Sequence, residues 1–101
     1  MISPALHVPK EAIAKLCRES QIRELAIFGS ATRADFKPAT SDLDILVEFR
    51  PEAHLGWFRF TDVQEALEAL FQRKVDLVST RGLNKRIREE VLASREIIYA
   101  E

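Results

Sequence analysis

Two apolar segments separated by a short polar stretch constrain the fold of this chain more than any other feature. The first is Leu25–Phe28, which leads directly into Gly29 and Ser30, and the second spans residues 43–49. Each segment has the length of a buried strand. Residues 31–41 contain the polar and proline residues of a helical turn followed by a loop. The pattern predicts two strands of one sheet, joined by this connection.

Two carboxylates open the second strand at alternate positions. Side chains alternate along a strand, so Asp42 and Asp44 project from one face, roughly 6.5–7 Å apart. The other face carries only apolar side chains, which are Leu43, Ile45, Val47 and Phe49. Neighbouring carboxylates repel each other unless a cation lies between them. Oxygen ligands favour Mg²⁺, which completes its shell with water and substrate phosphate, so the strand predicts a metal-bound phosphate.

A third carboxylate lies in a later apolar segment, Lys74–Val78. Val75 and Leu77 point one way along this strand and Asp76 points the other way. If the apolar side packs on the core, Asp76 emerges on the face that carries Asp42 and Asp44. Three carboxylates are what a two-metal phosphoryl-transfer site requires, and Asp76 could also accept the proton of an attacking hydroxyl.

The Gly-Ser turn supplies groups that bind phosphate. Gly29 allows the backbone to approach a phosphate closely, and the amides that follow can open a helix N-terminus. The Ser30 hydroxyl adds a donor, and Arg33 could reach the same anion with its guanidinium group. Taken alone, each feature also suits a structural cap or a solvated strand end, whereas the combination indicates a nucleotide–metal site.

The remaining pattern predicts alternating helices and strands. The other expected elements are a helix from near Pro9 through Cys17, a helix over about 57–72, a helix from Asn84 to about Ala93 and a short strand at Ile97–Tyr99. Ile87, Val91 and Leu92 are expected to bury the last helix. The fold class is α/β (α+β), with a mixed sheet of three or four strands and helices packed on one face. Ile97–Tyr99 could complete this sheet or pair with another subunit.

Length and composition limit the classes of function. The 101 residues suit a single domain over 1–101. No stretch reaches the roughly 20 apolar residues of a membrane helix, and the N-terminus lacks the pattern of a signal peptide. The single cysteine, Cys17, agrees with a cytoplasmic location. A net charge of −1 argues against direct nucleic-acid binding.

The order of these motifs resembles that of the minimal nucleotidyltransferases of the DNA polymerase β-like superfamily. That family carries a Gly-Ser pair, a spacer, Asp-X-Asp and an aspartate on a later strand. Here the matching residues are Gly29-Ser30, Asp42-Leu43-Asp44 and Asp76, and the likeness covers nearly the whole chain. It implies the polymerase β-like nucleotidyltransferase fold.

The resemblance also implies a reaction and a partner. Such short chains are similar to the antitoxins of toxin–antitoxin pairs whose toxin is an all-helical HEPN ribonuclease. The implied reaction moves AMP from ATP to a toxin hydroxyl, typically a tyrosine, with release of pyrophosphate. Asp42 and Asp44 would bind Mg²⁺, with two ions expected, and Asp76 would bind metal or activate the acceptor. Gly29 and Ser30 would hold phosphates. A hetero-oligomer with the toxin is expected.

The sequence departs from the family pattern at two positions. Eleven residues separate Ser30 from Asp42, one more than is most typical, and Ala34 stands where relatives often have glycine. Neither change removes a ligand. Two other functions remain open at this point. They are a non-catalytic antitoxin that acts by binding alone, and an adenylyltransferase of a small molecule that uses a second subunit.

Overall fold

The computed structural model describes residues 7–29, 42–52 and 60–101 of the chain. Within them the elements follow the order α1 (Lys10–Glu19), β1 (Ile22–Phe28), β2 (Leu43–Phe49), α2 (Phe60–Phe71), β3 (Val75–Ser79), η3 (Thr80–Gly82), α3 (Lys85–Ser94) and β4 (Glu96–Ala100). The alternation of helices and strands and the single mixed sheet are therefore as predicted. None of the described helices has the length and apolar character needed to cross a membrane.

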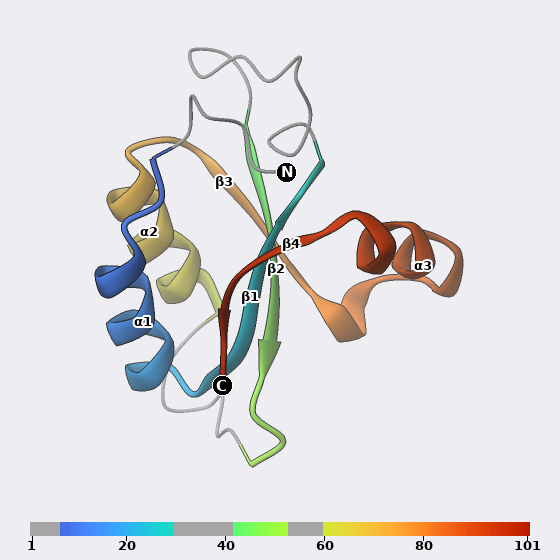
Figure 1. The fold of residues 1–101 in the computed structure, drawn as a ribbon, viewed down its shortest axis with the longest axis horizontal. Coiled ribbons are helices and arrows are strands. Elements are labelled where there is room, and N and C mark those ends of the chain that lie inside the picture. The colour runs from blue at the N-terminus through green and yellow to red at the C-terminus, as the bar shows by residue number, and fades with distance from the viewer. Residues whose placement is uncertain (1–6, 30–41, 53–59) are drawn as a thin grey trace.

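The sheet has four strands in the order β3-β2-β1-β4 (Figure 1). β1 pairs antiparallel with both β2 and β4, while β2 and β3 run parallel. The crossover through α2 provides the long connection that a parallel pair needs. The last strand completes the domain's own sheet, which answers the question left open for Ile97–Tyr99. β3 and β4 are the two edge strands.

The main core lies between one face of the sheet and the helices α1 and α2. From β2 it takes Leu43, Ile45 and Val47, all three without exposed surface. Ile13 and Cys17 of α1 and three residues of α2 cover them; the latter are Val63, Leu67 and Phe71. The apolar face predicted for residues 43–49 thus forms the core, with Phe49 half-buried at its margin.

The expectation that the helices pack on one face holds for α1 and α2 only. A second apolar cluster joins Ala26 of β1 and Leu46 of β2 to Val91 of α3, with Leu92 packed against it. Ala26 and Leu46 alternate with the residues of the main core, so α3 lies over the opposite face of the sheet (Figure 1). The second face of the sheet is also apolar where Ala26 and Leu46 lie, and α3 buries this part of it.

Two further differences concern the ends of elements. Ile87 was expected to be buried, but it is 46% exposed, because α3 contacts the sheet mainly through its second half at Val91 and Leu92. β1 begins three residues before Leu25, at Ile22, because an irregularity between Ile22 and Glu24 turns Ile22 into the core. The expected start of α2 at residues 57–59 lies outside the described residues.

Candidate active site

Asp44 and Asp76 lie side by side at one end of the sheet. Each is the second residue of its strand, and the parallel register of β2 and β3 pairs them directly. Partners in one register point to the same face, and neighbouring strands are about 4.8 Å apart. Leu43 and Val75, one residue earlier, are buried in the core, so the two carboxylates point away from it. The predicted juxtaposition of Asp44 and Asp76 is confirmed, while their roles stay predictions.

Asp42 precedes β2 and is exposed. The next residue, Leu43, donates its backbone N–H to the carbonyl oxygen of Lys74 at 3.0 Å. This bond fixes the backbone next to Asp42 against β3. Asp42 therefore lies close to Asp44 along the chain, but the three carboxylates are not grouped closely enough to hold a metal, so the predicted cluster of Asp42, Asp44 and Asp76 is not found in the described structure.

Gly29 forms the other side of this pair. It follows β1, whose last residue, Phe28, is the register partner of Asp44. The backbone of Gly29 has a φ of 73°, in the left-handed region that favours glycine. A Cβ built at this position would overlap Oδ2 of Asp44 and lie 3.3 Å from its Cγ. The Asp44 carboxylate therefore packs against the bare Cα of Gly29.

This contact is a function of Gly29 that the sequence pattern did not reveal. The Gly-Ser pair indicated close approach of a phosphate, not of a carboxylate from the neighbouring strand. The missing information was the antiparallel register of β1 and β2, which places the Gly29 turn beside Asp44. Ser30 and Arg33, the other two residues expected at the phosphates, lie outside the described residues, as do Ala34 and the rest of the spacer.

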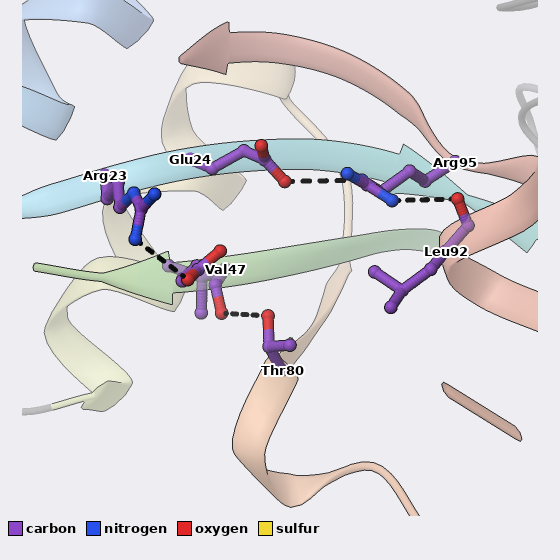
Figure 2. A network of polar contacts seen from close by, with 7 residues as sticks. Arg23, Glu24, Val47, Thr80, Leu92 and Arg95 are labelled. Carbon is purple, nitrogen blue, oxygen red and sulfur yellow. Dashed lines mark hydrogen bonds and ion pairs between the residues drawn. The ribbon is translucent and has the colours of Figure 1, made fainter. Parts of the chain in front are cut away.

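The same face of the sheet carries a second pair of neighbouring carboxylates, which have protein cations as partners. Glu24 and Glu48 are register partners on β1 and β2. Arg95 approaches Glu24 with Nε at 3.3 Å from Oε2, and Arg23 approaches Glu48 at 3.6 Å (Figure 2). No lysine or arginine within the described ranges forms such a pair with Asp76. At Asp76, a cation from solution could supply the counter-charge.

Hydrogen bonds to backbone oxygens close the end of α3 and join η3 to β2. Arg95 Nη1 donates to the carbonyl oxygen of Leu92 at 2.8 Å, and the Thr80 hydroxyl donates to that of Val47 at 3.3 Å (Figure 2). Asn84, where this helix was expected to begin, is the N-cap of α3, because its Oδ1 accepts the Ile87 backbone N–H at 3.0 Å. Of these bonds, that of Thr80 joins η3 to β2, the strand that carries Asp44.

The chemistry of the donor set fits a hard cation. Among the described residues no group of three or more His, Cys, Asp or Glu side chains is close enough together to hold a metal by itself. Mg²⁺ needs fewer protein ligands, since it usually takes one or two carboxylates and fills the other positions with water and phosphate. Asp44 and Asp76 supply two such carboxylates, so the arrangement suits a metal that arrives with a phosphate ligand.

Cys17 plays no part in the site. Its thiol is buried in the main core, and burial raises its pKa to about 12, although the nearby Arg18 acts in the opposite direction. A thiol with this pKa stays protonated at neutral pH and behaves as a small apolar side chain.

Comparison with known proteins adds a family and several relatives. Residues 11–101 match the family model described as "Polymerase beta, Nucleotidyltransferase". The Protein adenylyltransferase MntA of Thermococcus cleftensis is 41% identical over 78 residues, which cover 77% of this chain and 74% of that protein. A solved structure assigned as a minimal nucleotidyltransferase is 37% identical, covers 86% of both chains and superimposes with a TM-score of 0.71.

Two solved toxin–antitoxin complexes contain chains of the same fold. One complex holds AMP-PNP, and the matching chain is 20% identical with a TM-score of 0.69 over 93% of this chain and 75% of that chain. The other contains a tri-AMPylated HEPN toxin of Shewanella oneidensis with its MNT antitoxin. Here the match is 20% identical with a TM-score of 0.60, and it covers 91% of this chain and 70% of that chain. At this level of identity the two complexes show likeness of fold.

Proposed function

The chain belongs to the polymerase β nucleotidyltransferase family, and we propose that it transfers AMP from ATP to a hydroxyl group of a HEPN ribonuclease toxin, for which it acts as the antitoxin. The acceptor hydroxyl in this proposal is that of a tyrosine. The observation that carries the proposal is the pairing of Asp44 with Asp76, beside a glycine that leaves room for the Asp44 carboxylate. The relative that is named a protein adenylyltransferase and the AMPylated HEPN toxin complex support it.

The residues of the site have two kinds of role, which are to bind metal ions and to hold the phosphates in position. Asp42 and Asp44 bind Mg²⁺, and Asp76 binds metal or accepts the proton of the attacking hydroxyl. Gly29, Ser30 and Arg33 hold the phosphates. Two magnesium ions, when bound, neutralise the charge that develops on the phosphate oxygens. The other contribution of the chain is to fix these groups in place, which is most of what transfer at phosphorus requires.

The bonds of the reaction balance without a further reactant. The acceptor oxygen forms a bond to the α-phosphorus of ATP, and the bond from that phosphorus to the bridging oxygen of the β-phosphate breaks. Pyrophosphate leaves, and the acceptor proton passes to Asp76 or to solvent. The donor in this scheme is ATP, in agreement with the AMP-PNP found in a complex of the same fold. The buried, unpaired Cys17 suits the cytoplasm as the compartment.

The experiment is incubation with α-phosphate-labelled ATP, Mg²⁺ and the protein encoded by the adjacent reading frame. The double variant Asp42→Asn, Asp44→Asn serves as the inactive control. Glu48→Gln is the matched control, because Glu48 lies on the same face of β2 but pairs with Arg23 instead of facing the site.

Three outcomes distinguish the functions. Label on the partner protein that disappears in the double variant and persists in Glu48→Gln supports the proposal. A tight, unlabelled complex would identify an antitoxin that acts by binding alone. Label on a small molecule in place of the partner would identify the other alternative.

A further inference from the structure

The turn that leads into Asp76 is closed by one residue of α2, Glu68, through its main chain and its side chain. Gln72 follows α2 and has a φ of 54°, in the left-handed region. Arg73, the next residue, donates its backbone N–H to the carbonyl oxygen of Glu68 at 3.3 Å. This pattern of a left-handed residue and a bond back to the fifth preceding residue is a common way to end a helix. The main chain of Glu68 therefore fixes where the chain leaves α2.

The side chain of Glu68 holds the next part of the same turn. Its Oε2 accepts the backbone N–H of Val75 at 3.0 Å. β3 is an edge strand, so an N–H on its outer side has no neighbouring strand to accept it. Glu68 fills this position and satisfies a donor that is otherwise costly to leave unpaired.

The peptide unit between Lys74 and Val75 is thereby held from both sides. The carbonyl oxygen of Lys74 accepts the Leu43 N–H from β2 at 3.0 Å, and the N–H of Val75 points the opposite way to Glu68. The Val75 side chain is 1% exposed and is locked in the main core. The next residue is Asp76, which pairs with Asp44 in the sheet and has an exposed side chain.

We propose that Glu68 is a positioning residue for Asp76: its carboxylate fixes the first peptide of β3 and so sets where the Asp76 carboxylate stands beside Asp44. The inference rests on the proposed function, because it assigns Glu68 to the same site. Glu68 does not touch substrate or metal in this scheme. It acts through the backbone of Val75, and what it needs is an acceptor atom, not a negative charge.

The test compares two substitutions at this position. Glu68→Ala removes the acceptor, and Glu68→Gln keeps an amide oxygen at the same place. We expect Glu68→Ala to lower kcat for AMP transfer roughly tenfold to a hundredfold, with the KM for ATP changed by less than about twofold. Glu68→Gln should restore most of kcat. The exchange of the Val75 amide proton should accelerate in Glu68→Ala and stay slow in Glu68→Gln.

Two controls separate positioning from a general loss of stability. Glu65→Ala changes an exposed glutamate one turn earlier on α2 and should leave kcat unchanged. Val63→Ala removes core volume from the same helix, so it should lower the melting temperature without lowering kcat. A Val63→Ala enzyme as slow as Glu68→Ala would overturn the positioning role.

The inference and the proposed function fail in different ways. An active wild type with an equally active Glu68→Ala variant would overturn the inference and leave the function standing. A wild type without AMP transfer would overturn the function. Amide exchange would then still test whether Glu68 holds the backbone of Val75. A Val75 amide that is equally protected in Glu68→Ala and in the wild type would overturn this structural claim.

Discussion

The carboxylate of Asp44 occupies the space where a side chain on Gly29 would begin. The two residues belong to neighbouring antiparallel strands, and the register partner of Asp44 is the residue just before Gly29. Glycine is thus required here for two independent reasons, which are its φ of 73° and the position of Oδ2 of Asp44. The Gly29 turn and the Asp44 carboxylate are a single structural unit.

Gly29→Ala should therefore impair both the fold and the site. The left-handed backbone costs about 1–2 kcal/mol for a residue with a Cβ. The new methyl group also pushes the Asp44 carboxylate away, and misplacement of this size lowers AMP transfer roughly a hundredfold. Urea unfolding measures the first effect and the labelled-ATP assay measures the second.

Gly82→Ala is the matched control for this substitution. Gly82 lies in η3, and a Cβ there meets no atom within 4 Å. We expect its stability and activity to stay close to those of the wild type. A Gly29→Ala protein with full activity would mean that Asp44 need not stand where the structure has it.

Asp76→Asn should abolish transfer without unfolding the chain. Asp76 is exposed and its register partner is Asp44, so the substitution removes a repulsion between neighbouring carboxylates. The melting temperature without metal should stay equal or rise slightly, whereas the labelled-ATP assay should show a loss on the order of 10²-fold or more.

Metal addition gives an independent measure of the same site. A ligand that binds only the folded state raises the melting temperature. We expect Mg²⁺ with ATP to do so in the wild type and in Glu65→Gln, and to do so less in Asp76→Asn. An Asp76→Asn protein that unfolds by itself would show that this carboxylate is structural.

The strands and the paired carboxylates could be predicted because their signals are local. Alternation of apolar and acidic residues identified β2, and Val75 and Leu77 fixed the direction of Asp76. The parallel pairing of β2 and β3 then placed Asp76 beside Asp44. The register of these two strands is tightly restricted, since a slip by one residue would turn the residues of the main core out of it.

Other features depended on contacts between distant parts of the chain. The position of α3 over the second face, with Ile87 exposed, depends on which apolar face it covers, and helical periodicity does not contain that information. The contact of Gly29 with Asp44 required the register of β1. The hydrogen bond from Val75 to Glu68 could not be predicted without knowing that β3 is an edge strand.

Gln72→Gly should stabilise the protein. Gln72 has a φ of 54° and closes α2 at a position where glycine is favoured. The gain from relieving the left-handed backbone exceeds the entropy that glycine loses on folding, so we expect roughly 0.5–1 kcal/mol in the free energy of unfolding. Urea titration measures it. Gln64→Gly, inside α2, should instead cost roughly 0.5 kcal/mol, and equal effects of the two would contradict this reason.

Cys17 should resist alkylation in the folded protein. Burial raises the pKa of its thiol to about 12, so at pH 8 very little thiolate is present, and the sulfur is covered by the core. The raised pKa also means that the folded state keeps this proton when the unfolded chain has lost it. The stability that this group contributes is therefore complete below about pH 9 and declines as the pH rises from there towards 12.

Iodoacetamide labelling of Cys17 followed by mass measurement should show slow reaction in buffer and fast reaction in denaturant, with Cys17→Ala unreactive in both. Rapid labelling of the folded chain at pH 8 would show that α1 opens readily from the sheet.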